Sequence, residues 1–485
     1  MAARRAALAL AALPPALAFT YEKTLSSPPS LPKLYSSHAL ASHYMEQPFT
    51  VLSRLVEVTS YIPRLVVDPS PENLTNALTS LGPAFIKFGQ QLSIRPDLLP
   101  PEYLPSLSTL TDNCPSFSTA TAHKIIEAEL RCPLTTVFPD GLTLVAAASL
   151  GQVYKGTLKQ SGIMVAVKVQ RPDVRSMVSL DLFLVHFLSA LFDFTTVHFR
   201  HRDSNSSEFT ALVETFAAGS YSELDYVNEA KQQIRFKEGL KPMNINVHIP
   251  DVHFDYSTGR IITTSWIDGI KLSSCTDAVI NKLIPVGVEL FLAQLLDLGM
   301  FHADPHPGNM LVQVGKDGEP QLTLIDFGLT TSISDGERRA MTAAIYHLLT
   351  RDFGKLIKED TVKLGFLKEG FGGFEELTPV LDNVIRKGME GGSDMRKRRR
   401  QFREISGDLN QIFFDYPFTV PPFFALITRG LGLLEGIALK GDSEFDIFTA
   451  SYPFAIKKGM ALGLKGAFSG GSDGVVVAAS GQSNS

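Results

Sequence analysis

The sequence predicts an α+β protein with two lobes, in which a small antiparallel sheet precedes a larger helical lobe and a helical extension comes before both. Apolar residues recur three and four positions apart over residues 46–135, which is the spacing of helices. Short β-branched segments replace this pattern at residues 142–170 and return at 246–269. From Pro285 to about residue 465 the helical spacing dominates again.

These changes of pattern divide the chain into segments. We expect a targeting segment (1–45), a helical extension (46–140), a sheet lobe (141–270) with inserted helices at 176–217, a helical lobe (271–465) and a disordered tail (466–485). A further helix is expected over residues 223–238, between the inserted helices and the strands at 246–269.

The composition is that of a globular protein with no nucleic-acid partner. The chain has 485 residues, of which 44% are hydrophobic, and a net charge of −5. The basic run at 395–403 is interpreted as a solvated surface, with anionic lipid head groups as the alternative ligand. The 3 cysteines are too few and too scattered for a disulfide framework or a zinc site, so a reducing compartment is expected.

The first 45 residues have the composition of a targeting sequence. Two arginines precede an apolar stretch and a small-residue cleavage pattern, and a serine- and proline-rich segment follows. This resembles the two-part address of plastids acquired by secondary endosymbiosis. A plastid is therefore expected, with a mitochondrion or secretion as alternatives.

No transmembrane span is expected. The apolar segments at 179–194 and 422–439 carry charged residues and are interpreted as buried or amphipathic helices. Peripheral attachment to a membrane or to lipid droplets is compatible with the sequence.

The first β segments carry a candidate phosphate-binding turn. Protein kinases cover the nucleotide phosphates with G-x-G-x-x-G-x-V between two strands. The same frame here reads Ala146-x-Ala148-x-x-Gly151-x-Val153, and alanine restricts the backbone freedom that glycine allows. By itself this turn is a weak signal. The residues that we assign to it are Ala146, Ala147, Ala148, Ser149, Leu150, Gly151 and Val153.

A lysine in the next strand strengthens the assignment. Lys168 lies between valines in MVAVKVQ, where kinases place the ammonium that binds the phosphates. Such a lysine needs a helical carboxylate to hold it, and we expect Glu229 to be that partner. Ser265 and Ile267, from the segment at 246–269, are also assigned to ATP binding.

Two acidic loops in the helical lobe complete the set. In HADPHPGN the step from Asp304 to Asn309 equals the aspartate-to-asparagine step of the kinase catalytic loop, and Asp326 follows in LIDFG. Asn309 and Asp326 are predicted to bind Mg²⁺ together with the phosphates of ATP, because Mg²⁺ prefers hard oxygen ligands. Asp304 is predicted to accept or orient a proton on the attacking nucleophile.

With these motifs in order, residues from about 75 to 465 resemble the UbiB-type atypical kinases, also called the aarF-domain family. IKFGQQ is similar to that family's K-x-G-Q motif, with Lys87 and Gln90, and ELDYVNEA is similar to its E-x-D motif, with Glu223 and Asp225. The resemblance implies an atypical protein-kinase-like fold and ATP- and Mg²⁺-dependent activity in isoprenoid quinone or prenyl-lipid metabolism. It also implies that the K-x-G-Q helix lies over the active site, where a peptide would otherwise bind.

The resemblance implies partners as well: a prenyl-lipid, quinone or membrane surface, and enzymes of prenylquinone biosynthesis. Lys87 is expected to reach Glu223 or Asp225, and the four motif residues are assigned a regulatory role, with Lys87 also counted among the catalytic residues.

The segment after Gly328 argues against a conventional protein kinase. It contains no A-P-E sequence, and Ser334 and Glu337 instead form a capping box that opens a helix. Two alternatives stay open: a small-molecule kinase of the aminoglycoside or choline type, and a nucleotide-binding scaffold for lipid enzymes without turnover.

Overall fold

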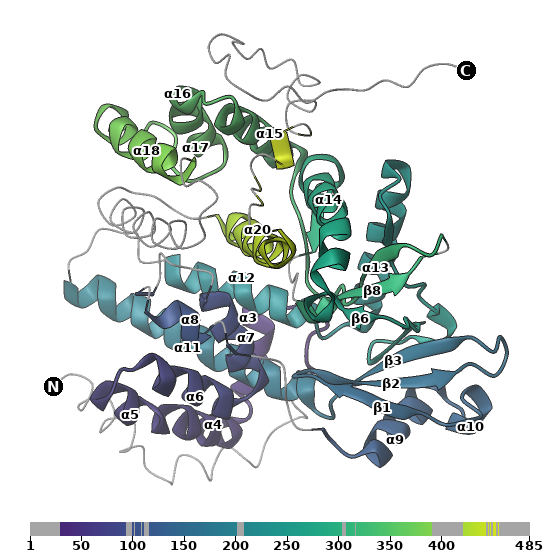
Figure 1. The fold of residues 1–485 in the computed structure, drawn as a ribbon. Coiled ribbons are helices and arrows are strands. Elements are labelled where there is room, and N and C mark those ends of the chain that lie inside the picture. The colour runs from purple at the N-terminus through teal and green to yellow at the C-terminus, as the bar shows by residue number, and fades with distance from the viewer. Residues whose placement is uncertain are drawn as a thin grey trace, which may run out of the picture. The chain divides into compact units, whose positions relative to one another are not determined.

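The computed structural model describes residues 30–93, 99–100, 102–107, 109–110, 116–200, 208–302, 307–315, 317–389, 421–442, 445, 447, 450–452 and 454. The chain divides into two compact units. The first contains Met1–Gly287, Met300–Thr331 and Pro422–Gly441, and the second contains Val288–Gly299, Ser332–Pro421 and Asp442–Ser485. Figure 1 shows helices and short strands in the order that the sequence predicts, and the α+β class is confirmed.

The N-terminal part of the first unit is helical, as expected. Its helices are α3 (Ser37–Tyr44), α4 (Pro48–Ser60), α5 (Ile62–Val67), α6 (Pro71–Leu81), α7 (Pro83–Leu92) and α8 (Tyr103–Leu107). Proline occupies the first turn of α4, α5 and α6, where it lacks only an N–H that would have no partner in the helix. Leu78, Phe85 and Leu107 form the buried centre of this group, which sets the position of α7.

A four-stranded antiparallel sheet follows, in the order β1-β2-β3-β5. Its strands are β1 (Thr143–Ala147), β2 (Gly151–Thr157), β3 (Met164–Gln170) and β5 (Ile261–Ser265), and two helices accompany it, α9 (Thr119–Leu130) and α10 (Leu134–Val137). Val165, Val167 and Val169 of β3 are completely buried in one core cluster with Ile126 of α9. Because strand side chains alternate between the two faces, Lys168 emerges on the face away from α9.

Three helices lie between β3 and β5 in the sequence: α11 (Val174–Arg200), α12 (Glu208–Ser222) and α13 (Tyr226–Leu240). Tyr44 of α3, Leu182 of α11 and Tyr221 of α12 share one buried cluster. The helix expected at 223–238 begins only at residue 226. The reason is local, since the Asp225 side chain accepts the Val227 N–H and caps the helix there.

The two strand segments expected at 246–269 join different sheets, which local sequence patterns cannot show. β4 (Val247–His248) pairs in parallel with β9 (Pro320–Leu324), in a second sheet ordered β4-β9-β8-β6. The remaining strands are β6 (Ile270–Lys271), β8 (Met310–Val314) and the pair formed by β7 (Met300–His302) and β10 (Thr330–Ser332). Short 3₁₀ turns are η1 (Lys241–Met243), η2 (Phe254–Tyr256), η3 (Leu272–Ser274) and η5 (Pro307–Asn309).

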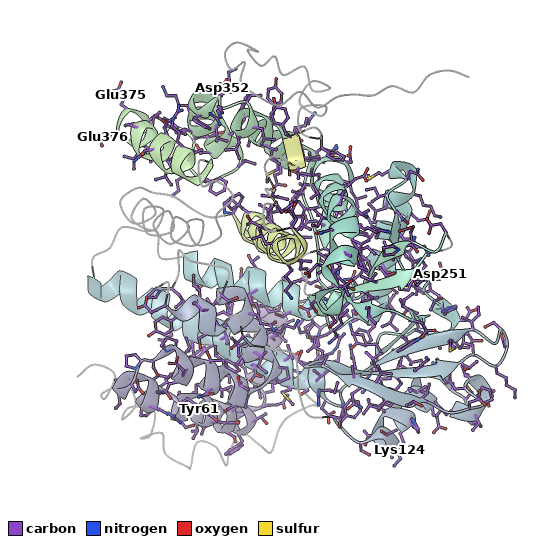
Figure 2. The ribbon with its side chains drawn as sticks, viewed as in Figure 1. Tyr61, Lys124, Asp251, Asp352, Glu375 and Glu376 are labelled. Carbon is purple, nitrogen blue, oxygen red and sulfur yellow. The ribbon has the colours of Figure 1, made fainter. Side chains whose placement is uncertain are left out.

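The second unit is helical. Helix α14 (Asp277–Ala293) begins in the first unit and ends in the second. The other helical elements of the second unit are η4 (Gln294–Leu298), α15 (Asp335–Leu349), α16 (Phe353–Lys355), η6 (Leu356–Asp360), α17 (Thr361–Lys363) and α18 (Phe374–Met389). Helix α20 (Pro422–Gly441) belongs to the first unit. The capping box of Ser334 and Glu337 at the start of α15 is confirmed. Glu375 and Glu376 lie in the first turn of α18 (Figure 2), where their charges complement the helix dipole.

Two helical stretches among the described residues are long and apolar enough to cross a membrane, judged by length and composition alone. They are Val174–Leu191 and Asp277–Leu298, in which 39% and 50% of the residues are buried. Core helices of soluble proteins pass the same test. The expectation that no helix spans a membrane therefore stays a prediction.

Candidate nucleotide and metal site

Lys168 is the centre of a charged cluster on the face of the first sheet that points away from α9. Its Nζ lies 2.9 Å from Oε1 and 3.0 Å from Oε2 of Glu229, so the predicted ion pair is present. The same ammonium donates to Oδ2 of Asp326 at 3.1 Å. One cation thus joins β3, α13 and the segment after β9, three elements far apart in the sequence.

Glu229 reaches this cluster because Asp225 sets where α13 begins. With Asp225 at the N-cap, Glu229 lies in the first turn, where a negative charge is favoured. The Glu229 side chain is only 4% exposed, so its charge depends on Lys168 for compensation.

Asp326 is held in a left-handed backbone conformation. Its φ is 64°, which costs a residue with a Cβ about 1–2 kcal/mol. The Gly328 N–H donates to Oδ1 of Asp326 at 3.2 Å and stabilises this turn. A Cβ on Gly328 would lie 3.3 Å from Oδ1 of Asp326 and 3.5 Å from Oε2 of Glu229, so a larger side chain there would press on both carboxylates.

The two carboxylates of the cluster titrate in opposite directions. Burial raises the pKa of Glu229 to about 7, although Lys168 acts to lower it. Burial acts to raise the pKa of Asp326 too, but Lys168, the Gly328 N–H and Lys87 outweigh it and lower that pKa to about 2. The Asp326 side chain is 42% exposed, so this carboxylate is both ionised and accessible to a ligand.

Asn309 lies beside Asp326 because their strands pair. Met310 of β8 is opposite Leu324 of β9, and the Ile325 N–H donates to the Asn309 carbonyl at 3.0 Å. The structure therefore places the backbones of the two predicted metal ligands next to each other. Asp304 lies outside the described residues, so its role stays a prediction.

These donors suit a metal that is bound together with phosphate. Carboxylate and amide oxygens are the ligands that Mg²⁺ prefers, and it normally takes one or two carboxylates plus substrate phosphates. Within the described ranges no group of three or more His, Cys, Asp or Glu is arranged to hold a metal. Asn309 and Asp326 fit a Mg²⁺ ion that phosphate oxygens help to bind.

The alanine-rich segment forms the turn between β1 and β2, as predicted. Ala146 pairs with Val153 and Ala147 with Gln152, and the Ala148 N–H donates to the Gly151 carbonyl at 2.8 Å. Residues 148–150, which we call the alanine turn, thus connect the strands directly, and Ser149 within it is buried.

Arg171 holds the alanine turn against the end of β3. Its Nε donates to the Ala148 carbonyl at 3.0 Å, and its backbone N–H donates to the Leu150 carbonyl at 3.0 Å. No sequence motif pointed to Arg171 as part of the site. Its position directly after the strand MVAVKVQ was the available signal.

The last glycine of the turn motif is required by close packing. A Cβ on Gly151 would lie 2.5 Å from the Val169 carbonyl oxygen and 2.7 Å from the Tyr226 hydroxyl oxygen. Both distances are shorter than van der Waals contact allows, so any other residue would force β2 away from β3.

Lys87 on α7 meets the E-x-D motif, as predicted. Its Nζ lies 3.2 Å from Oε2 of Glu223, and both side chains are mostly buried, at 15% and 12% exposed. Asp225 serves as the N-cap of α13, while Gln90 donates from Nε2 to the Leu110 carbonyl at 3.0 Å. The charge of Lys87 also acts to lower the pKa of Asp326.

Ser265 and Ile267 lie at the other end of the sheet. The Ser265 N–H donates to the Asp251 carbonyl at 2.9 Å, and its Oγ lies 3.1 Å from Nε2 of His253. Between them, the Trp266 N–H donates to the Met164 carbonyl at 2.9 Å, and Lys155 lies over the indole ring at 4.5 Å. ATP contacts of Ser265 and Ile267 stay predictions.

Comparison with known proteins agrees with this arrangement. The model of the ABC1 atypical kinase-like domain matches residues 109–360, just over half of the chain. The chain belongs to the ABC1 atypical kinase-like family. The match includes Lys168, Glu229, Asn309 and Asp326, whereas Lys87 precedes it.

Curated relatives support the family membership. Protein ACTIVITY OF BC1 COMPLEX KINASE 3, chloroplastic, of Arabidopsis thaliana is 35% identical over 88% of this chain and 60% of its own length. An uncharacterised aarF domain-containing protein kinase of Arabidopsis, also named chloroplastic, is 36% identical over 79% of this chain and 53% of its own length. An uncharacterised Synechocystis protein is 35% identical over 87% of this chain and 76% of its own length. The chain thus spans little more than half of the two Arabidopsis proteins.

A solved structure extends the comparison to the fold. The Rv3197 protein of Mycobacterium tuberculosis, solved in complex with erythromycin, covers 81% of this chain and 97% of its own, with a TM-score of 0.51 and 22% identity. At this identity the likeness concerns the fold alone. The predicted kinase-like fold class is confirmed.

Proposed function

We propose that this chain is a Mg²⁺–ATP-dependent atypical kinase or ATPase that acts in plastid prenyl-lipid or isoprenoid quinone metabolism. The observation that carries the proposal is the charged cluster, in which Lys168 contacts both Glu229 and Asp326 while Asn309 lies next to Asp326. The parts that position a nucleotide triphosphate in kinases are an ammonium, its helical carboxylate and two metal ligands.

Each residue has a distinct task in this proposal. Lys168 binds phosphate oxygens and Glu229 holds its ammonium in place, while the alanine turn covers the phosphates. Mg²⁺, held by Asn309 and Asp326, would supply neutralisation of the phosphate charge. Asp304 would orient the attacking hydroxyl or water.

The acceptor is proposed to be a small molecule, a lipid or water rather than a peptide. The ion pair between Lys87 and Glu223 supports this choice, because it anchors α7 to the segment directly before α13, the helix that carries Glu229. We expect Lys87→Ala to loosen α7 and to permit autophosphorylation in cis. Radiolabel from ATP would appear on the variant and not on the wild-type chain.

ATP turnover with and without lipid tests the proposal. ADP release would be measured for the wild-type chain and for Asp326→Asn, in detergent-free buffer and with liposomes that contain a prenylquinone. We expect Mg²⁺-dependent release that the liposomes increase and that the variant lacks. Tight ATP binding without release would favour the scaffold alternative, and turnover only with aminoglycosides or choline would favour the small-molecule kinase.

Peripheral attachment to a membrane is the second part of the proposal. α4 and α5 expose an apolar face that consists of Phe49, Leu52, Val56, Ile62, Val66 and Val67. Phe49, Leu52 and Val56 form one stripe along α4 at helical spacing, as in helices that lie in a lipid interface. Flotation with liposomes tests this surface. Leu52→Glu with Val56→Glu should abolish flotation, whereas Thr50→Glu, which is exposed on the same helix about 100° around from Phe49, should reduce it less.

A plastid location is proposed from the two-part targeting segment, and the chloroplast names of the Arabidopsis relatives support it. Residues 1–45 fused to a fluorescent protein should direct it to plastids in an alga with secondary plastids. Fluorescence in mitochondria would contradict this location.

A further inference from the structure

Tyr226 differs from the other fully buried tyrosines of the first unit; among the described tyrosines it shares a buried, unpartnered hydroxyl only with the half-buried Tyr35. Tyr44 donates to the Ser176 carbonyl at 2.9 Å, Tyr221 donates to the Pro32 carbonyl at 2.8 Å, and the Tyr154 hydroxyl accepts from Gln152 at 2.6 Å. The Tyr226 hydroxyl is equally buried, yet it has no hydrogen-bond partner among the described residues. A buried polar group without a partner destabilises the folded protein, so its retention calls for an explanation.

The position of this side chain supplies one. The Lys168 ammonium lies 5.1 Å from the centre of the Tyr226 ring, a cation–π distance. The other end of the ring, the hydroxyl, lies so close to Gly151 that a Cβ there would be 2.7 Å from it. Tyr226 therefore extends from Lys168 to Gly151, the residue directly after the alanine turn. Lys168 and the alanine turn are the two features that contact phosphates in the proposed function.

We propose that Tyr226 is a phosphate-binding residue, whose hydroxyl donates a hydrogen bond to a phosphate oxygen of the bound nucleotide, directly or through one water. This inference rests on the proposed nucleotide-dependent function and deepens it. Burial raises the pKa of the Tyr226 phenol above its ordinary value, so the group keeps its proton and can donate. A bound phosphate would supply the missing partner.

Tyr226→Phe tests the proposal, because it removes the hydroxyl and keeps the ring beneath Lys168. Binding of Mg²⁺–ATP, Mg²⁺–ADP and adenosine would be measured by calorimetry and by the fluorescence of Trp266, the single tryptophan of the sequence. We expect affinity for ATP and ADP to fall by about tenfold or more, as for loss of a hydrogen bond to a charged group, while adenosine binding is unchanged. The melting temperature of the nucleotide-free variant should stay level or rise.

Tyr221→Phe is the matched control. It removes a buried hydroxyl that does have a partner, so it should lower the melting temperature and leave nucleotide affinity unchanged. Two outcomes would contradict the phosphate role. In one, Tyr226→Phe binds ATP, ADP and adenosine like the wild type. In the other, Tyr226→Phe loses thermal stability as Tyr221→Phe does, and its affinity for adenosine falls as well. A wild-type chain that binds no Mg²⁺–ATP would overturn the proposed function and this inference together.

Discussion

Two ion pairs in the first unit each join a cation to both oxygens of a buried carboxylate, but their surroundings differ. In the helical extension, Arg54 of α4 donates to both carboxylate oxygens of Asp181 on α11, at 2.7 and 3.1 Å. In the charged cluster, Lys168 donates to both oxygens of Glu229, at 2.9 and 3.0 Å. Asp181 is 1% exposed and Glu229 is 4% exposed, so both pairs bury a carboxylate.

The difference lies in the remaining contacts of each cation. Arg54 also donates to the Leu81 carbonyl and contacts Glu57, so its planar guanidinium connects α4, α6 and α11. Both cations thus contact a second carboxylate, but Glu57 is three residues from Arg54 on the same helix, whereas Asp326 lies far from Lys168 in the sequence, next to Asn309. The planar fork of Arg54 suits a fixed contact between helices, whereas the Lys168 ammonium beside a half-exposed carboxylate can exchange that carboxylate for a ligand.

The largest expected effect is on stability and concerns the first pair. Asp181→Asn should lower the free energy of unfolding by about 3–5 kcal/mol, because it leaves Arg54 buried without its main partner. Glu229→Gln should cost less than about 1 kcal/mol, since Lys168 keeps Asp326 and a buried charge is removed. Urea unfolding of both variants measures the contrast. Equal losses would mean that the two pairs have the same structural role.

The next effect is on ligand binding and concerns the second pair. A ligand at one hundred times its dissociation constant stabilises a protein by about 2.7 kcal/mol. We expect Asp326→Asn to lose most of this stabilisation by Mg²⁺–ATP, because it removes a metal oxygen, while Asp181→Asn keeps it. Thermal shifts with and without Mg²⁺–ATP measure both. If Mg²⁺–ATP raised the melting temperature of Asp326→Asn as much as that of the wild type, the assignment of Asp326 as a metal ligand would be wrong.

The pH dependence should separate the two carboxylates of the cluster. The pKa of Glu229 is raised from 4.5 in the unfolded chain to about 7 in the folded protein. Between these two pH values the unfolded chain loses this proton more readily, so the folded state becomes less stable as pH rises from 4.5 to about 7. The pKa of Asp326 is lowered from 3.8 to about 2, so its contribution is present above pH 3.8 and is lost below it. The melting temperature of Glu229→Gln relative to wild type should therefore increase from pH 4.5 to 7. A constant difference would contradict the raised pKa.

The smallest expected effect concerns the alanine turn. Ala148→Gly adds backbone freedom, so it should change ATP affinity by a few-fold, about 1 kcal/mol or less. Because Arg171 holds the Ala148 carbonyl, Arg171→Ala should act in the same direction. Calorimetry with ATP measures both variants, and wild-type affinity in both would mean that the turn does not contact the nucleotide.

Local sequence patterns were sufficient to predict much of the site. The valines that alternate around Lys168 predicted its strand and its face, and Ser334 with Glu337 predicted a helix start, because both signals depend on neighbours in the chain. The order of motifs predicted that Glu229 would be the lysine's partner, although 61 residues separate them.

Other features depended on contacts between distant segments and could not be predicted locally. The pattern at 246–269 indicated strands, but only pairing with residues near 322 assigned β4 to the second sheet. The start of α13 was misplaced because Asp225 resembles a helical residue until its side chain is seen to cap the helix.

The sequence by itself determined the kinase-like order of elements and the chemical identity of Lys168, Glu229, Asn309 and Asp326, since periodicity and motif spacing are properties of the chain. Only the tertiary structure decided that Lys168 is shared by two carboxylates, that Arg54 and Asp181 connect the helical extension to α11, and that Tyr226 is buried without a partner. The physical reason is that burial and electrostatic pairing depend on which side chains meet in space, and residues 54 and 181 carry no local signal that they will meet.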